Sequence, residues 1–200
     1  MGGSDADLKV RAPYGRRVSP GSRVWYGRCD DAGMSYRRPP RLARFDYRGK
    51  YRYHLTSSTC ERRECFLRAE VVAVVRLAIR RTLHERDFEE LAYVFMPSHM
   101  HLLIEGVSQI ADLKATMKVV RMRSTVAART LVAMPSLWQD GYWDRVLRPD
   151  EDVALVADYI AMNPVRAGLV ERPEDYPYVF SKYHKNLNAH PPLIPPCDRT

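Results

Sequence analysis

The chain has 200 residues, 46% of them hydrophobic, and a formal net charge of +8. This length fits one domain with appended tails, and the hydrophobic content is that of a folded protein rather than a disordered one. No apolar run approaches the length of a membrane span, and no secretory signal opens the chain, so we expect a cytoplasmic protein without membrane contact. The net positive charge, in which arginine dominates, suggests a polyanionic partner such as nucleic acid. Neither a P-loop nor a dinucleotide fingerprint is present.

Composition divides the chain into three regions. Residues 1–45 are rich in Gly, Pro, Ser and Arg, which predicts a flexible basic arm that could lie along phosphates, although a solvated tail fits equally well. Residues 46–181 carry the periodic patterns of a folded domain. Residues 182–200 predict an irregular tail, and the Pro- and Tyr-rich stretch from Pro173 onward is expected to be irregular as well.

The first half of the domain alternates between strand and helix patterns. Residues 51–57 alternate apolar and polar side chains, which indicates a half-buried strand. One apolar stripe predicts a helix over residues 63–84, and residues 88–96 predict a second strand that ends at Pro97. A third strand follows at His99, so the second and third strands are expected to be antiparallel neighbours.

The second half of the domain supplies the remaining elements of a known fold. Ser108 is expected to cap a helix over residues 110–132, and residues 136–148 predict a fourth strand or a short hairpin. A third helix is expected over residues 150–163, because Pro164 disfavours helical geometry at the residue before it. This order predicts an α+β fold, a ferredoxin-like β-α-β-β-α-β sheet with an additional C-terminal helix.

Two histidines flank Met100 on the predicted third strand. Side chains alternate along a strand, so His99 and His101 share one face, about 7 Å apart along the backbone. Met100, Leu102 and Ile104 then point to the other face, under the helices. Two imidazoles on the open face can bind one metal ion but cannot saturate it, which implies a further ligand and open positions. A pair of solvated surface histidines is the alternative.

The last predicted helix offers a nucleophile and a ligand to the same site. Tyr159 and Asn163 are four residues apart and share a helical face, which could lie across the open face of the sheet. A tyrosine can attack a phosphodiester that a hard divalent ion, Mg²⁺ or Mn²⁺, polarises, and an amide oxygen can bind such an ion. Alternatively, Tyr159 rests at the surface and Asn163 caps the turn that begins at Pro164. His54 is expected to be structural or to support a ligand.

Basic and aromatic side chains are candidates for contacts with DNA. Cations on a helix more often form a solvated face, and tryptophan is more often buried, so each candidate has a structural alternative. The candidates are Lys114, Lys118, Arg121, Arg123, Arg145 and Trp138.

Three ordered blocks carry a family resemblance. The sequences YVFMPSHMHLLIE, LWQDGYWDRVLR and YIAMNPVRAGLVERPEDYPYVF resemble the single-tyrosine HUH (His-hydrophobic-His) transposases, in particular the REP-associated tyrosine transposases. The resemblance covers roughly residues 38–180 and identifies residues 46–181 as the catalytic domain. It implies a bacterial, nucleoid-associated enzyme that cuts single-stranded DNA beside a hairpin and becomes linked to the 5′ phosphate.

The resemblance also implies roles for particular residues. Tyr159 matches the nucleophile, while His99, His101 and Asn163 match the metal ligands, although some relatives have glutamine at the last position. Some relatives are homodimers and others are monomers, and both states stay open for this chain. A domesticated regulator that binds hairpin DNA or RNA without cutting is the alternative function.

Overall fold

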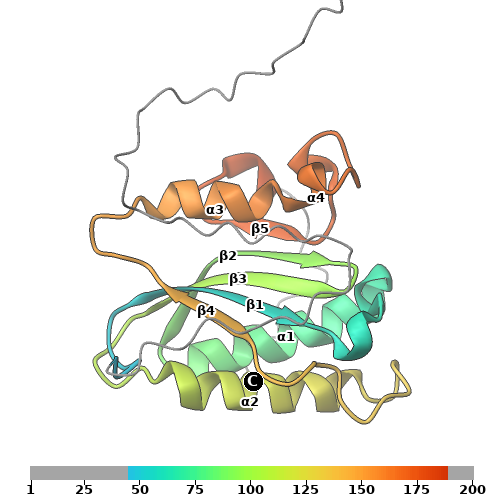
Figure 1. Cartoon of the computed structure of the whole chain (residues 1–200), viewed down its shortest axis with the longest axis horizontal. Coiled ribbons are helices and arrows are strands. Elements are labelled where there is room, and N and C mark those ends of the chain that lie inside the picture. The colour runs from blue at the N-terminus through green and yellow to red at the C-terminus, as the bar shows by residue number, and fades with distance from the viewer. Residues whose placement is uncertain (1–44, 189–200) are drawn as a thin grey trace, which may run out of the picture. The chain divides into compact units, whose positions relative to one another are not determined.

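The computed structural model describes residues 45–188. The expected arm, residues 1–45, and residues 189–200 of the expected tail lie outside this range, apart from Phe45. Within residues 45–188, no helix has the length and apolar character needed to cross a bilayer. The helices and strands are β1 Arg52–Ser58, α1 Ala69–Glu85, β2 Phe88–Met96, β3 His99–Gly106, α2 Leu113–Ala128, β4 Trp143–Val146, α3 Val153–Ala161, α4 Asn163–Arg166 and β5 Val179–Ser181 (Figure 1).

The strands form one antiparallel sheet in the order β4-β1-β3-β2-β5. The first four strands have the ferredoxin-like order, with β1 and β3 at the centre, so the predicted fold class is confirmed. Strand β5 is a correction, because the region after Pro173 was expected to be irregular. This short strand pairs with β2 at the edge of the sheet, where Val179 and Ser181 are buried.

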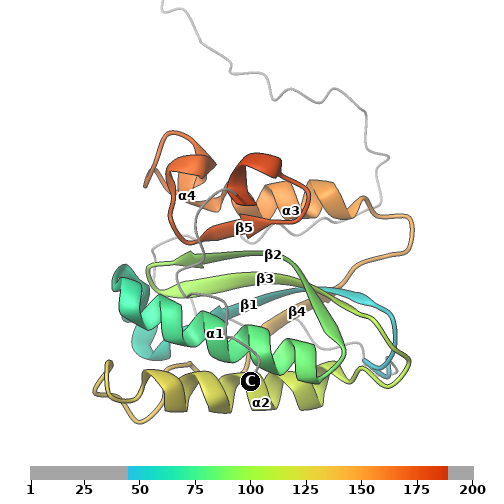
Figure 2. The same ribbon diagram turned by 180° about the vertical axis from the view of Figure 1, so that it is seen from behind.

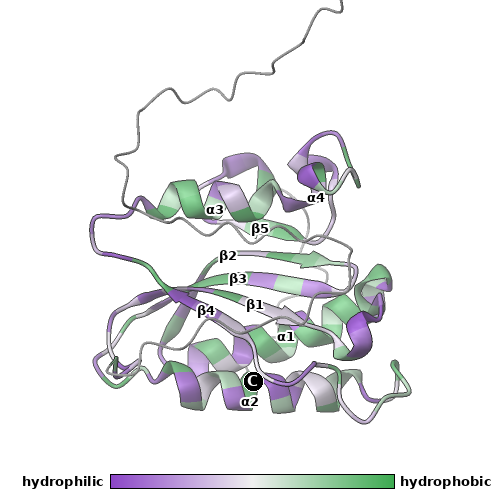
Figure 3. Cartoon of the chain, viewed as in Figure 1, coloured by the Kyte–Doolittle hydropathy of each residue, from purple (hydrophilic) through white to green (hydrophobic). Residues whose placement is uncertain are grey.

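Helices α1 and α2 cover one face of the sheet. Met100, Leu102 and Ile104 of β3 are at most 1% exposed and belong to the same core as residues of α1 and α2, as predicted. Figure 2 shows α1 in front of the strands when the molecule is seen from behind. Hydrophobic and hydrophilic bands alternate along α2, as in a helix that buries one side (Figure 3).

Helix α3 packs on the other face of the sheet. Val156 and Ile160 join a second core with Val94 of β2 and Leu103 of β3. The helix contacts β2 and β5 more than β3, and it has no comparable contact with β1 or β4. The histidines of β3 therefore lie on the half of this face that β1, β3 and β4 form. That half is next to α3 and is not covered by it.

Helix boundaries differ from the predicted ones where a cap was misassigned. Helix α2 begins at Leu113, because Asp112 Oδ1 accepts a hydrogen bond from Ala115 N at 2.9 Å. Ser108 Oγ instead donates to Asp87 Oδ2. In the tail, residues 185–188 form one 3-10 turn.

Candidate functional site

Two histidines of β3 and two residues of β1 share one face of the sheet. His101 lies opposite Thr56, and His99 lies opposite Ser58, in the antiparallel pairing of β3 with β1. Directly opposed residues point to the same face of a sheet. The ring centroids of His99 and His101 are 5.1 Å apart and their planes are inclined by 83°. The pairing therefore brings two imidazoles together.

One ring nitrogen of each histidine has no hydrogen-bond partner. His99 Nδ1 and His101 Nε2 are buried and unpartnered within the described part of the chain. A buried polar atom without a partner costs free energy, about 1–3 kcal/mol for an ordinary hydrogen-bonding group. Such a pair of atoms is free to bind a ligand, and imidazole nitrogens are common ligands of divalent metal ions.

Strand β1 holds the other ring nitrogen of His101. His101 Nδ1 lies 3.0 Å from Thr56 Oγ1 and 3.3 Å from His54 Nε2. His54 is 6% exposed, and its ring packs edge-on against Trp143 of β4 at 5.2 Å between centroids. When His101 Nδ1 carries the ring proton, its N–H can donate a hydrogen bond to Thr56 Oγ1 or to His54 Nε2. The lone pair of His101 Nε2 is then available to a metal ion. His54 thus supports His101.

Burial lowers the pKa of all three imidazoles. Desolvation lowers the pKa of His54 to about 3, with a smaller contribution from the charge of Arg145. Desolvation likewise lowers the pKa of His99 to about 4, assisted by Arg62. The pKa of His101 lies well below its ordinary value, first through desolvation and then through neighbouring positive charges. The three rings are therefore neutral at pH 7.

Helix α3 and the following turn carry Tyr159 and Asn163. Tyr159 is partly exposed, whereas Ala157 and Ile160 are fully buried. Asn163 is the first residue of α4 and does not cap it with its side chain. Its Nδ2 donates to the carbonyl oxygens of Tyr159 at 3.3 Å and Ile160 at 3.0 Å. The Asn163 amide oxygen takes no part in these bonds.

Arg166 contacts Tyr159 but was not among the residues singled out from the sequence. Its guanidinium carbon lies 3.9 Å from the centroid of the Tyr159 ring, and its Nη1 donates to the Tyr159 carbonyl oxygen at 2.9 Å. The charge of Arg166 also makes a small contribution to lowering the pKa of His101. The spacing of seven residues, about two helical turns, was the sequence signal for this contact.

The residues present fit a metal ion that is held by few protein ligands. Within residues 45–188, no group of three or more His, Cys, Asp or Glu side chains could hold a metal ion. The described residues instead offer the unpartnered nitrogens of His99 and His101 and the amide oxygen of Asn163. A divalent ion bound by such a set would keep positions for water and substrate.

The basic residues expected on the second helix lie on α2, across the sheet from the histidines. Arg121 donates hydrogen bonds to carbonyl oxygens in the loop of residues 139–141, and Arg123 forms an ion pair with a glutamate of α1. Lys114 and Lys118 are exposed. The Lys114 ammonium lies 4.6 Å from the centroid of the Tyr47 ring. Three of the four predicted DNA contacts on α2 thus have structural partners.

The two tryptophans of this region have different environments. Trp138 is 3% exposed and its Nε1 donates to Ser124 Oγ at 2.8 Å, so its ring is part of the core. This burial corrects the prediction that the Trp138 ring is available to DNA bases. Trp143 is partly exposed on β4, where it and Arg145 face the histidine side. Arg145 forms an ion pair with Glu151.

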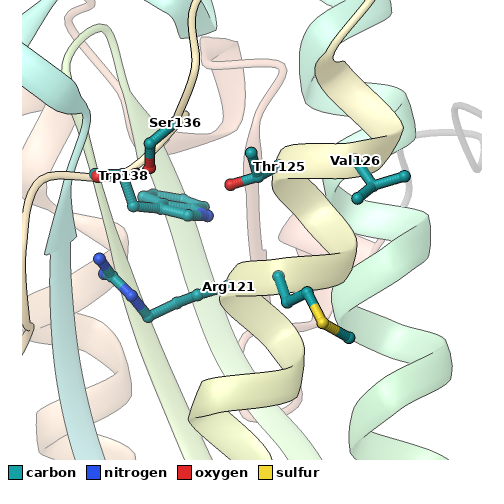
Figure 4. Close-up of a pocket in the computed structure, with 6 residues that line it drawn as sticks. Arg121, Thr125, Val126, Ser136 and Trp138 are labelled. Atoms are coloured by element: carbon teal, nitrogen blue, oxygen red, sulfur yellow. Dashed lines mark hydrogen bonds between the residues drawn. The ribbon is translucent and has the colours of Figure 1, made fainter.

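A hollow of about 300 Å³ lies over α2 and the loop that follows it. In Figure 4, the Arg121 side chain and the Trp138 ring lie on the same side of the α2 backbone, whereas Val126 points away from Trp138. Because α2 packs on the opposite face of the sheet from the histidines, this hollow is separate from the candidate site. Its lining residues are Arg121, Met122, Thr125, Val126, Ser136 and Trp138.

Known proteins resemble this chain in sequence and in fold. The family described as "Transposase IS200 like" matches residues 48–163. A Haemophilus influenzae protein assigned as a REP-associated tyrosine transposase is 30% identical over 147 residues, which cover 68% of this chain and 82% of that protein. The REP-associated tyrosine transposase of Escherichia coli K12 is 29% identical over 114 residues, which cover 57% of this chain and 66% of that protein.

One solved structure has the same fold. It is the structure of a REP-associated tyrosine transposase bound to a REP hairpin, and it matches with a TM-score of 0.62 at 24% sequence identity. The match covers 78% of this chain and 90% of that one. The two proteins therefore share the α+β fold.

Proposed function

The chain belongs to the IS200-like transposase family, and on that basis we propose that it cuts and rejoins single-stranded DNA with Tyr159 as the nucleophile. His99, His101 and Asn163 are the proposed ligands of a divalent ion, Mg²⁺ or Mn²⁺. The observation that carries the proposal is the pair of buried, unpartnered ring nitrogens on the sheet face against which the tyrosine helix packs. A divalent ion bound to both nitrogens would supply the partners that they lack within the protein.

The proposed cleavage is an attack of Tyr159 Oη on the phosphorus of the scissile phosphodiester. The Oη–P bond forms and the P–O3′ bond breaks, so the downstream strand stays on the tyrosine through its 5′ phosphate. The phenolic proton passes to solvent, and the departing O3′ takes up a proton to become a hydroxyl. A 3′ hydroxyl can reverse the reaction, which conserves the phosphodiester energy. A bound metal ion would polarise a non-bridging phosphate oxygen.

The low pKa values of the imidazoles suit metal binding. A histidine must be neutral to bind a metal, and protons compete with the ion where the ring titrates. The pKa of His99 is lowered to about 4 and the pKa of His101 is also lowered, so protons do not compete with a metal ion for either ring near pH 7.

Hairpin-forming single-stranded DNA is the proposed substrate. One protein of the same fold has been solved with a REP hairpin, and sequence relatives bear the name REP-associated. On this chain, the partly exposed ring of Trp143 can stack on a base. Basic side chains on the histidine side of the sheet, such as Arg145, can contact phosphates.

The test uses single-stranded DNA from the repeats that flank the gene, labelled separately on each side of the expected cut. We expect a protein–DNA adduct that survives denaturation, requires Mg²⁺ or Mn²⁺, and carries only the downstream label. Tyr159→Phe should abolish the adduct, whereas Tyr183→Phe, which changes an exposed tyrosine elsewhere, should not. DNA binding without any adduct from the unmodified protein would favour the regulator that binds hairpins without cutting.

A single chain carries all the proposed parts, because α3 packs on the sheet of its own chain. We therefore expect His99→Ala and Tyr159→Phe proteins to remain inactive when they are mixed. Recovered adduct formation in the mixture would mean that two subunits share their tyrosine helices.

A further inference from the structure

The turn after α3 places the positively charged side chain of Arg166 against Tyr159. Pro164 is buried in α4, and Gly168 ends the turn at a φ of +69°, a left-handed conformation that favours glycine. Leu169 N donates to the Pro164 carbonyl oxygen at 2.9 Å, which closes the turn. Arg166 is thereby held seven residues beyond Tyr159 on a short, hydrogen-bonded segment.

Arg166 contacts Tyr159 through both its plane and one of its N–H groups. The guanidinium carbon is 3.9 Å from the ring centroid, a cation–π distance, and Nη1 donates to the Tyr159 carbonyl oxygen at 2.9 Å. A guanidinium has five N–H donors, and this one is exposed at the surface. The remaining donors are thus available to a ligand beside the Tyr159 ring.

We propose that Arg166 binds the scissile phosphate while its stacked guanidinium holds the Tyr159 ring in line for attack. This inference rests on the proposed function. Arginine suits both tasks, because its flat fork binds phosphate oxygens in pairs and stacks on aromatic rings, whereas lysine provides only a point charge. Arg166 binds a non-bridging oxygen of the phosphate and transfers no proton, while the bond changes are those of the tyrosine attack.

The first experiment compares adduct formation at saturating DNA in the unmodified protein, Arg166→Ala, Arg166→Lys and Arg172→Ala. Loss of one preorganised donor to a reacting oxyanion typically costs about 10²–10³-fold in rate, which is the fall expected for Arg166→Ala. Arg166→Lys should recover about tenfold at most, because it lacks the stacked plane. Arg172→Ala is the matched control, since Arg172 is an exposed arginine paired with Asp175, and its rate should stay unchanged.

Two further measurements separate a phosphate contact from a structural role. Millimolar guanidinium should partly restore the rate of Arg166→Ala but not that of Arg172→Ala. In the Tyr159→Phe background without metal, Arg166→Ala should reduce the slope of log affinity against log salt by about one, as for the loss of one phosphate contact. Thermal unfolding of each variant gives the folded fraction.

An unchanged rate in Arg166→Ala would overturn the inference. The inference would also be overturned if the rate of both Arg166 variants fell only in proportion to their folded fraction. If the unmodified protein forms no adduct, the proposed function fails, and the salt dependence of binding alone decides whether Arg166 meets a phosphate.

Discussion

The contacts that hold His101 predict how metal affinity depends on residues that would not touch the metal. His101 Nδ1 has two neighbours, Thr56 Oγ1 at 3.0 Å and His54 Nε2 at 3.3 Å. The changes to make are Thr56→Val and His54→Phe, singly and together. Valine keeps the shape of threonine, and phenylalanine keeps a flat ring against Trp143.

The magnitude follows from the tautomer that metal binding needs. A metal on Nε2 requires the proton on Nδ1, and the double variant leaves that buried N–H without an acceptor. An unpartnered buried donor costs about 1–3 kcal/mol, so affinity for the ion should fall about 10- to 100-fold. Each single variant keeps one neighbour, and its affinity should fall less than tenfold.

Calorimetric titration of metal-free protein with Mn²⁺ measures this difference without relying on activity. Thr82→Val is the matched control, because the buried Thr82 hydroxyl donates to the Ala78 carbonyl oxygen within α1, away from the histidines. A folded double variant that binds Mn²⁺ as tightly as the unmodified protein would refute the reasoning that His54 and Thr56 orient His101.

Three other predictions concern stability and binding. Burial raises the pKa of Glu90 to about 7, so the folded state holds its proton more tightly, and stability should fall as pH rises from about 4.5 to 7; thermal unfolding of Glu90→Gln should lack this part of the dependence. Tyr176→Phe removes a buried bond of 2.8 Å to the Phe95 carbonyl oxygen and should cost about 1 kcal/mol in urea unfolding. In a binding titration, Trp143→Ala should weaken single-stranded DNA binding about 5- to 100-fold if its ring stacks on a base, whereas Trp138→Ala should mainly lower the unfolding temperature, by removing core packing.

Local patterns were sufficient for the central features of the fold. The period of two along β3 predicted that Met100 would be buried and that His99 and His101 would share the other face, and the structure confirms both statements. The order of strands and helices predicted the ferredoxin-like sheet, because few topologies connect such elements with short loops. The accessibility of the site differs from expectation, since His101 is only 7% exposed.

The predictions that failed depended on contacts between distant segments. Residues 179–181 form a strand only because the edge of β2 accepts them, and no local pattern signals that pairing. Trp138 is buried because its ring packs in the core against Phe66, where Ser124 of α2 accepts its N–H. Asp112 rather than Ser108 caps α2, and Ser108 bonds to Asp87.

The sequence by itself determined which side chains share a face of each element, since strand and helix periods depend only on backbone geometry. It therefore predicted the histidine pair, which the structure confirms, whereas the common face of Tyr159 and Asn163 stays a prediction, since α3 ends at Ala161 and Asn163 begins α4. Only the tertiary structure decided that His54 and Thr56 hold His101 and that Arg121 bonds to a loop. These contacts form when packing brings separate segments within hydrogen-bonding distance, which one-dimensional patterns do not encode.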